Sequence, residues 1–367
     1  MNLLYDHQIF VKQQYGGVSR IFVEIIKHLR EYPDVKIELP LLYSHNTHLV
    51  ENNFHPTKPY LQRPFKGRTT LMNSINVLNN FYTNKQLRKQ NFDVFHPTYY
   101  DTYFLSALKQ KPFVLTIYDM THEKMAHQEL KTDKTIEYKQ ILAHKATHII
   151  AISENTKKDI HEIYGISEQK ITVSYLDNSL KPVVNYSPEL KFPDFYILFV
   201  GNRRVYKNFD LFLDAVAPLL KENNDLHLVC AGGAAFNSAE EHRIQTLGIK
   251  KQVVQTAIPD NLLAHLYQNA QCFVFPSLYE GFGIPTLEAF ACECPVALSY
   301  ASSMPEVGGD AALYFDPNSK ESIFQTVQKI IYDRDLQNQL RAKGREQLQK
   351  FSWQQSARQH YELYKNL

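Results

Sequence analysis

The sequence lacks the features that mark several classes of protein. It has no run of about 18 apolar residues, which excludes a membrane-spanning helix. Lysine and arginine number 40 against 38 aspartates and glutamates, without the basic excess of a general nucleic-acid binder. Four cysteines in 367 residues make no disulfide framework, and we expect buried thiols in a reducing compartment. The N-terminus has no charged leader before an apolar stretch, so we expect a cytoplasmic protein without a secretion signal.

The composition is that of a globular protein. Hydrophobic residues make up 44% and charged residues 21%, which excludes disorder over most of the chain. At roughly 150 residues per domain, the length predicts about two domains, each with its own core.

Short apolar runs alternate with longer amphipathic stretches. Several runs are continuously apolar, as in strands buried on both faces, and residues 18–30 carry an apolar stripe at helical spacing. This alternation predicts an α/β protein with doubly wound parallel sheets. The predicted strands are 2–5, 36–43, 93–96, 113–118, 148–152, 171–175, 196–201, 226–231, 252–255, 272–276, 296–299 and 312–315.

A polar stretch divides these runs into two series. Residues 177–194 contain Pro182, Pro188 and Pro193, which indicate a linker. We therefore predict two Rossmann-like domains, residues 1–183 and 184–351, with a cleft between them. The last segment, 352–367, has Trp353, Ala357, Tyr361 and Tyr364 at helical spacing.

The segment 44–91 is too long for a simple connection and is predicted to contain a helix. It is the most basic part of the chain, and its basic residues are Lys58, Arg63, Lys66, Arg68, Lys85, Arg88 and Lys89. The segment is either a solvated helical excursion or a patch that binds an anionic acceptor or a membrane surface through residues 58–89.

The strongest chemical pattern spans residues 275–289, FPSLYEGFGIPTLEA. A strand leads into a loop with Gly281 and Gly283, and Pro285 then opens a helix. The backbone amides and the positive dipole end of such a helix favour phosphate. Glu280 and Glu288 bracket this site and suit the hydroxyls of a sugar and a ribose. Alternatively, Glu288 only complements the helix dipole and Glu280 is a loop charge.

Two further patterns follow predicted strands. Residues 199–208, FVGNRRVYKN, place Arg203, Arg204 and Lys207 at a strand's carboxyl end, where open α/β sheets bind ligands and cations suit phosphate. Gly16 and Gly17 open the first helix and let backbone amides approach a ligand. The alternatives are a solvated basic turn and a plain helix entry.

Together these patterns resemble the retaining glycosyltransferases of family 4, which have the GT-B fold. Glu280 and Glu288 match the family's Glu-x7-Glu signature, and residues 201–207 match its Gly-Arg-Leu…Lys segment. Segments 152–156, 177–179 and 303–307 follow in the family's order. The similarity extends over nearly the whole chain and is greatest to mannosyl- and rhamnosyltransferases of surface-polysaccharide and lipopolysaccharide synthesis.

The resemblance implies catalytic roles for Arg203, Lys207 and Glu280, with Arg203 and Lys207 on the donor pyrophosphate and Glu280 at the donor sugar. The implied donor-binding residues are Gly16, Gly17, Asn202, Arg204, Gly281, Phe282, Gly283 and Glu288, with Glu288 on the ribose. Asn202 stands where many relatives have arginine. Both Arg203 and Arg204 therefore remain candidates for the phosphate contact, and we favour Arg203. Tyr118 replaces a family histidine, and either Tyr118 or His122 would contact the sugar.

The resemblance also implies the organisation and the reaction. Residues 1–183 would serve the acceptor, residues 184–351 would bind the nucleotide sugar, and the last helix would return to the first domain. The expected reaction is a retaining sugar transfer from a GDP-mannose-like donor to a saccharide or lipid-linked saccharide. We expect no metal and no other cofactor, since cations hold the pyrophosphate, and we expect a cytoplasmic enzyme or one peripheral on the inner membrane face.

Other functions remain as alternatives. A sugar-nucleotide epimerase of the same fold would need a second group of carboxylates at the sugar, and none is obvious. A non-catalytic sugar-nucleotide-binding protein would have lost the basic turn or the glutamate pair, and neither is lost. A nicotinamide oxidoreductase is disfavoured, because no Gly-x-Gly-x-x-Gly follows the first strand.

Overall fold

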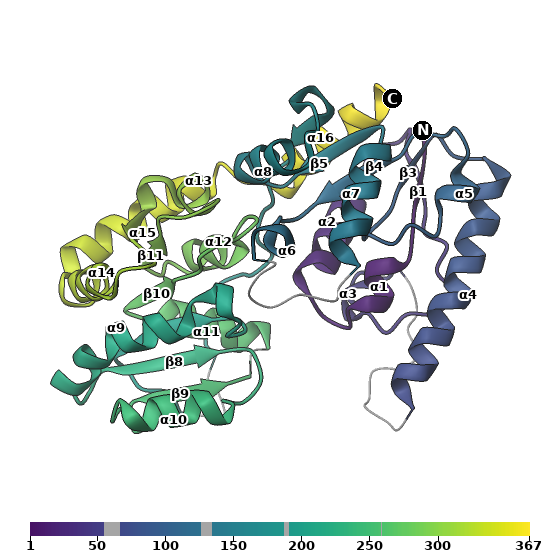
Figure 1. Ribbon diagram of the computed structural model, residues 1–367. Coiled ribbons are helices and arrows are strands. Elements are labelled where there is room, and N and C mark those ends of the chain that lie inside the picture. Colours follow the sequence, from purple (N-terminus) through teal and green to yellow (C-terminus); the bar gives the residue numbers. More distant parts are fainter. Residues whose placement is uncertain (55–66, 126–133, 187–190, 258) are drawn as a thin grey trace. The chain divides into compact units, whose positions relative to one another are not determined.

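A computed structural model describes residues 1–54, 67–125, 134–186, 191–257 and 259–367 (Figure 1). The chain forms two compact units. Unit one ends at Leu176 rather than at residue 183 and also includes Ser352–Leu367, and unit two runs from Asp177 to Phe351. Lys58, Arg63, Lys66 and Pro188, which the sequence patterns used, lie outside the described residues.

Every apolar run that was predicted as a strand contains one, and all pairings are parallel. Two Rossmann-like α/β units are therefore confirmed. The strands of unit one are β1 (Asn2–Tyr5), β2 (Lys36–Glu38), β3 (Val94–His96), β4 (Val114–Ile117), β5 (His148–Ala151) and β6 (Ile171–Val173). Those of unit two are β7 (Tyr196–Val200), β8 (His227–Ala231), β9 (Val253–Thr256), β10 (Cys272–Phe275), β11 (Val296–Ser299) and β12 (Ala312–Phe315).

Helices connect these strands and cover the sheets. In unit one they are α1 (Gln8–Lys12), α2 (Gly17–Leu29), α3 (Thr47–Glu51), α4 (Arg68–Lys89), α5 (Leu105–Leu108), α6 (Thr121–Lys124), α7 (Thr135–Lys145), α8 (Glu154–Tyr164) and α16 (Trp353–Lys365). In unit two they are α9 (Phe209–Glu222), α10 (Ser238–Thr246), α11 (Asp260–Asn269), α12 (Ile284–Ala291), α13 (Met304–Gly308), α14 (Lys320–Tyr332) and α15 (Arg334–Leu348).

Strand β2 is shorter than the predicted run of residues 36–43. Pro40 has no backbone N–H and cannot donate to a ladder. Beyond it, the N–H groups of Leu42 and Tyr43 donate to Oδ1 of Asn79 at 2.8 and 3.4 Å. A side chain of α4 thus takes the place of a neighbouring strand.

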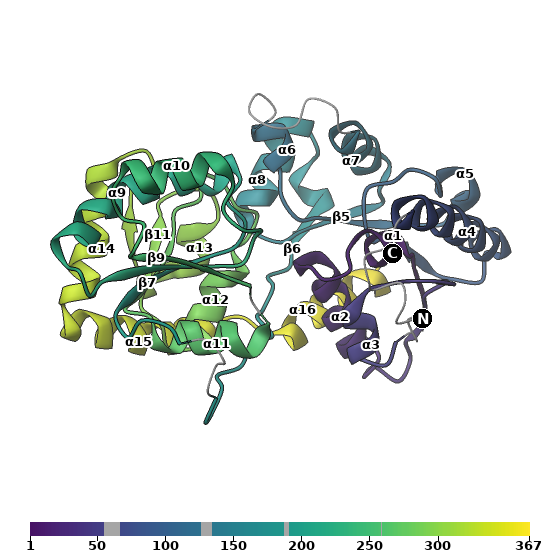
Figure 2. The same ribbon diagram turned by 90° about the horizontal axis from the view of Figure 1, so that it is seen from below.

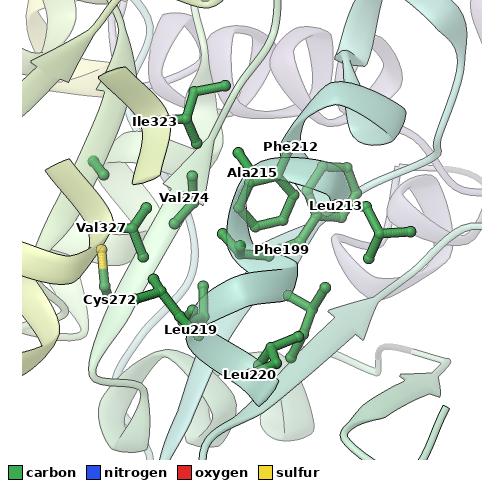
Figure 3. Close-up of a cluster of buried hydrophobic side chains, with 14 of the residues drawn as sticks. Phe199, Phe212, Leu213, Ala215, Leu219, Leu220, Cys272, Val274, Ile323 and Val327 are labelled. Atoms are coloured by element: carbon green, nitrogen blue, oxygen red, sulfur yellow. The ribbon is translucent and has the colours of Figure 1, made fainter. Parts of the chain in front are cut away.

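Unit two has the strand order β12-β11-β10-β7-β8-β9, the order of dinucleotide-binding Rossmann domains. Its core packs α9 and α14 onto one face of the sheet, where Phe199, Phe212, Val274 and Val327 meet (Figure 3). Helices α11 and α12 lie on the opposite face (Figure 2). The order reverses between β7 and β10, and the carboxyl ends of those two strands therefore define the expected ligand site.

Unit one has two three-stranded sheets, β2-β1-β3 and β4-β5-β6. They meet at a single parallel bridge between Phe95 and Phe113. Strand β2 lies on one side of β1, and β3, which follows later in the chain, lies on the other side. The strand order of this unit therefore reverses between β1 and β3. The predicted amphipathic stripe of residues 18–30 forms α2.

The last helix, α16, belongs to unit one. The hydroxyl of Tyr364 lies 3.0 Å from that of Tyr5 and 2.6 Å from Nδ1 of His96, while Tyr361 stacks on Tyr32. Burial lowers the pKa of His96 well below its usual value and that of His360 to about 4, so both imidazoles are neutral in the folded unit.

The segment 44–91 carries α3 and the long α4. Helix α4 has three different sides. Ile75, Asn79, Thr83 and Leu87 are buried against the unit, and Asn73, Asn76 and Asn80 follow one another along a second side. The third side exposes Leu71, Val77, Leu78 and Phe81, followed by Lys85, Arg88 and Lys89.

Candidate functional site

The loops after β7 and β10 are joined at the reversal point of unit two. The N–H of Leu278 donates to the carbonyl of Tyr206 at 2.8 Å. Asn208, in the left-handed region with φ 57°, donates from Nδ2 to the carbonyls of Pro276 and Pro317. Asparagine tolerates this backbone conformation better than most residues. These bonds fix the two loops relative to each other.

Lys207 and Glu280 meet where these loops join. Nζ of Lys207 lies 2.5 Å from Oε1 of Glu280, and the two side chains are only 13% and 14% exposed. The ammonium also lies 5.0 Å from the centre of the Phe275 ring. A pair with this little water around it interacts more strongly than a surface pair. The structure thus brings together two of the three residues for which the sequence implied catalytic roles.

The segment 280–282 is also held by residues that follow β11. Oγ of Ser303 donates to the carbonyls of Glu280 and Phe282 at 2.9 and 3.1 Å, and Ser302 accepts from the N–H of Glu280 at 2.9 Å. The sequence patterns gave no role to either serine or to Asn208. The position of Ser302 and Ser303 just after a predicted strand was the signal that could have found them.

Gly283 precedes the first residue of α12 and has a backbone conformation that favours glycine. Its φ is +96°, and a Cβ there would lie 2.4 Å from Cε of Met304. Pro285 occupies the first turn of α12, where its missing N–H costs nothing. The buried hydroxyl of Thr286 in the same turn has no hydrogen-bond partner within the described ranges. A ligand with acceptor oxygens at this helix start could satisfy such a group.

Glu288 lies in α12 beyond this turn and is half-buried. It accepts a hydrogen bond of 3.3 Å from the hydroxyl of Tyr267. Burial raises the pKa of Tyr267 well above its usual value, and the nearby Glu288 adds to that rise. Tyr267 is therefore a neutral donor that orients the Glu288 carboxylate.

Arg203 does not have the geometry expected of a phosphate ligand. Its Nε lies 2.7 Å from Oε1 of Glu240, and its side chain is only 5% exposed. The guanidinium also donates to the carbonyls of Gly232, Ala234 and Ala235. Its donors join the loop after β7 to the one after β8, so this geometry favours Arg204 for the phosphate contact, and the choice between the two arginines stays a prediction.

Arg204 and Asn202 are the exposed neighbours of Arg203. Oδ1 of Asn202 accepts from the N–H of Arg204 at 3.4 Å. Beyond them, the loop leads directly to Lys207 through a single turn of 3₁₀ helix, Val205–Lys207. Arg204 is thus the exposed arginine of the two, and it directly precedes the turn that carries Lys207.

Gly16 and Gly17 lie at the start of α2 in unit one. Gln13 accepts from the N–H of Ser19 through Oε1 at 3.1 Å, and Ser19 donates to the carbonyl of Gly16 at 2.9 Å. Part of the helix start is thus already capped by side chains, while a Cβ on Gly17 would meet nothing within 4 Å. These glycines and the Lys207–Glu280 pair belong to different units.

Tyr118 and His122 follow β4 in unit one. The Tyr118 hydroxyl is buried without a hydrogen-bond partner in the described part of the chain, and burial raises its pKa well above the usual value. His122 lies in α6, whose Glu123 forms a buried pair of 3.0 Å with Lys139. Lys139 also donates to the carbonyl of Asp119, so this pair holds the whole segment between Tyr118 and His122.

A cluster that the sequence patterns did not reveal lies at the reversal point of unit one. Asp6 follows β1 and is fully buried. Its carboxylate accepts from Nε2 of Gln8, from the N–H and hydroxyl of Thr98, and from the hydroxyl of Tyr103, at 2.7 to 3.0 Å. All these donors are neutral, and a buried carboxylate without a cation needs this full set of hydrogen bonds.

The described ranges contain no group of three metal-ligating side chains. Asp333 and Asp335 have the Asp-x-Asp spacing of some metal sites, but Asp333 caps α15 by accepting from the N–H of Leu336. Within the same ranges, no helix is both long and apolar enough to cross a membrane. All four cysteines are buried as free thiols.

Comparison with known families gives the class of protein. Residues 15–176 match the family "Glycosyltransferase Family 4", and residues 186–347 match "Glycosyl transferases group 1". Together with the two Rossmann-like units, these matches show that the chain belongs to the family 4 glycosyltransferases, enzymes with the GT-B fold.

Individual relatives are more distant. The chain is 33% identical to O-antigen chain mannosyltransferase B of Escherichia coli over 47% of this chain and 46% of that protein. It is 30% identical to O-antigen chain mannosyltransferase RfbU of Salmonella typhimurium, over 51% of each. The chain thus spans about half the length of these relatives. The crystal structure of Anabaena HepE with UDP and glucose is similar over both whole chains, with a TM-score of 0.74 and 16% identity, and this supports the fold alone.

Proposed function

We propose that the protein transfers a sugar from a GDP-mannose-like nucleotide sugar to a saccharide or lipid-linked saccharide of a surface polysaccharide. The observation that carries this proposal is the Lys207–Glu280 pair at the reversal point of unit two. The mannosyltransferase names of the partial relatives favour mannose over other sugars. The transfer would keep the anomeric configuration, as the family resemblance implies.

The proposed chemistry follows from charge. As the glycosidic bond breaks, the leaving nucleoside diphosphate gains negative charge, and cations aimed at it stabilise the transition state most. Lys207 would exchange its bond with Glu280 for the phosphate, and Arg204 would be the second cation. Glu280, released from Lys207, would then accept hydrogen bonds from the donor sugar.

The remaining contacts would hold the donor without changing during the reaction. Glu288, oriented by Tyr267, would accept hydrogen bonds from ribose hydroxyls. The segment 281–283 and the start of α12 would lie along the phosphates. Gly16 and Gly17 would contribute backbone amides from unit one, and Tyr118 or His122 would contact the sugar.

Helix α4 supports a peripheral location on the inner membrane face. Phe81 is 70% exposed and Val77 64%, and Lys85, Arg88 and Lys89 follow on the same side. Apolar side chains next to lysine and arginine suit an interface with anionic lipid headgroups. Co-sedimentation with anionic and with neutral vesicles tests this point, and equal recovery of wild type and Phe81→Ser from anionic vesicles would contradict it.

A donor screen is the direct test of the proposed function. GDP-mannose should raise the unfolding temperature by mass action more than UDP-glucose does, and incubation with an acceptor extract should yield an α-linked product. An epimerised nucleotide sugar would establish the alternative enzyme, and binding without turnover would establish a non-catalytic module. Activity should persist in excess chelator, and its rescue only by Mg²⁺ or Mn²⁺ would contradict the metal-free mechanism.

A further inference from the structure

Unit one contains a pocket of mixed polar and apolar lining, and none of the predicted donor residues line it. Its volume is about 300 Å³, and it lies between α1, α4 and the loop after β3. Helices α1 and α4 lie side by side in both views (Figures 1 and 2). This volume is at the lower end of the range of ligand pockets, about 300–1,000 Å³. It suits one sugar ring and part of the next rather than a nucleotide sugar.

Amide side chains dominate the polar lining. Gln8 comes from α1, and Asn73, Asn76 and Asn80 come from successive turns of α4. An amide has both an acceptor oxygen and a donor NH₂ group. Gln8 uses both within the protein and the oxygen of Asn80 bonds His7, so Asn73, Asn76 and the NH₂ group of Asn80 would serve the ligand. A hydroxyl group also donates and accepts at once, so a row of amides matches a ligand with several hydroxyls.

The charge of the lining disfavours an anion. Among the described residues that line it, Lys12 and Asp101 are the charged ones, one of each sign. A phosphate would gain from Lys12 and lose from Asp101, and it would find no arginine fork. This balance contrasts with the loops of unit two, where Arg204 and Lys207 lie three residues apart in sequence.

The lining also has apolar surface for the C–H face of a sugar. Val11, Met72 and the ring of Tyr99 supply it. The ammonium of Lys12 lies 4.0 Å from the centre of the Tyr99 ring, which fixes that ring at one edge of the pocket. An aromatic ring beside hydrogen-bonding amides gives a sugar both kinds of contact it needs.

The polar network behind the pocket holds the lining in place. Gln8 donates to Asp6 at 2.7 Å and accepts from the N–H of Asp101 at 2.8 Å. His7 binds Thr83 through Nδ1 and Oδ1 of Asn80 through Nε2, at 3.0 and 2.9 Å. Burial lowers the pKa of His7, which favours the neutral imidazole. A lining fixed by buried partners loses little entropy when a ligand binds.

We propose that this pocket binds a neutral, uncharged sugar ring of the acceptor. The inference rests on the proposed function, since it assigns the acceptor's sugar to unit one. A phosphate-linked part of the acceptor would bind elsewhere.

Ligand-detected saturation-transfer NMR on the full chain tests the pocket directly. The probes are the methyl glycosides of mannose, rhamnose, glucose and N-acetylglucosamine, each added with GDP present. At least one glycoside should show transfer with wild type. Asn76→Leu should reduce that signal at least fivefold, because it removes an amide and narrows the pocket, and Asn73→Leu is the second variant if Asn76→Leu fails to fold.

A matched control comes from the same helix. Asn84 lies about two turns further along α4 and is not part of the lining, so Asn84→Leu should keep the wild-type signal. Inorganic pyrophosphate should not displace the glycoside. A signal unchanged in Asn76→Leu, displacement by pyrophosphate, or no binding of any glycoside to wild type would overturn the pocket assignment.

A separate readout distinguishes this failure from failure of the proposed function. Release of nucleoside diphosphate from the donor without acceptor is measured in wild type, and Asn84→Leu, which lies outside the lining, should match it within twofold. If wild type consumes no nucleotide sugar while glycoside binding still depends on Asn76, the proposed function fails and the pocket stands. If donor is consumed but glycoside binding ignores Asn76, the pocket fails and the function stands.

Discussion

The two units have the same kind of parallel sheet, but they stabilise the carboxylate at its reversal point in different ways. In unit two, the reversal point carries Lys207 and Glu280 as an ion pair of 2.5 Å. In unit one, the reversal point carries Asp6, whose hydrogen bonds come from neutral donors. The sheets determine where the loops lie, and the side chains on them determine what binds there.

The two carboxylates also differ in what a ligand could do to them. Glu280 has one cation that a phosphate could draw away, so its environment can change during a reaction. Asp6 is completely buried and is satisfied by the protein itself. Under the proposed function, the Lys207–Glu280 charge pair is thus exchangeable, whereas the charge of Asp6 is part of the scaffold.

Within unit two, we expect the largest effect to be the difference in stability between substitutions of Arg203 and of Arg204. Arg203→Ala leaves the buried Glu240 without its cation and several carbonyls without a donor, which should lower the free energy of unfolding by about 3–5 kcal/mol. Arg204→Ala should change it by less than about 0.5 kcal/mol and weaken donor binding instead. Urea denaturation and donor titration of both variants measure this difference. Equal stability of the two variants would contradict a structural role for Arg203.

Removing the exchangeable cation should have the next largest effect. Lys207→Ala should raise the barrier to donor turnover by about 3 kcal/mol, which lowers turnover more than a hundredfold, because negative charge grows on the phosphate. The same substitution should also weaken donor affinity. Release of nucleoside diphosphate measures both. Lys320→Ala, which removes a more exposed lysine paired with Asp214, is the control and should keep wild-type turnover. Turnover of Lys207→Ala within threefold of wild type would show that the pair does not act on the donor.

Acid should affect unit one selectively. His360 is neutral when folded, with a pKa of about 4, against about 6.5 when unfolded. Between these values the unfolded state binds more protons, so stability falls as the pH drops from about 6.5 towards 4. From pH 7 to 5 the loss is about 2 kcal/mol for this group.

The single tryptophan, Trp353, lies in α16 and reports this loss by fluorescence during urea denaturation. His360→Gln should show a smaller change between pH 7 and 5. In the described part of unit two no histidine is buried. The urea midpoint of unit two, followed by circular dichroism, should therefore shift less between pH 7 and 5 than the midpoint reported by Trp353. A Trp353 transition that is independent of pH would contradict this account.

The smallest effect should come from a contact that does not change during the reaction. Glu288→Gln should weaken donor affinity by about 1.5 kcal/mol, roughly tenfold, because one charged hydrogen bond is lost. Saturated turnover should stay near that of wild type, since ribose hydroxyls gain no charge in the transition state. Steady-state kinetics separates the two quantities. Unchanged affinity with collapsed turnover would mean that Glu288 acts on the reacting sugar.

The sequence predicted the fold well because its signals are local. Each strand was a short apolar run. The largest overshoot was at residues 39–43, where Pro40 cannot donate to a ladder and Asn79 from a distant helix accepts from the N–H groups of Leu42 and Tyr43. Lys207 and Glu280 were both chosen from their own loops, and their contact follows from parallel strands ending at one edge.

The rest depended on partners far away in the sequence. Arg203 and Arg204 are adjacent, and only the position of Glu240 decides which one turns inward. Ser302 and Ser303 support a loop that lies about twenty residues before them in the sequence. No pattern around Asp6 indicates that Thr98 and Tyr103 donate to it. Such pairings are tertiary, so no local pattern could have revealed them.

The return of α16 to unit one has a consequence for biosynthesis. Tyr364 completes a cluster with Tyr5 and His96, so unit one cannot bury its first strand fully until α16 has been synthesised. Unit two is continuous in sequence from residue 177 to residue 351 and has all its residues before α16 appears. During synthesis, part of the core of unit one therefore stays uncovered while the whole of unit two is made, and an exposed core of this kind is what a ribosome-associated chaperone binds.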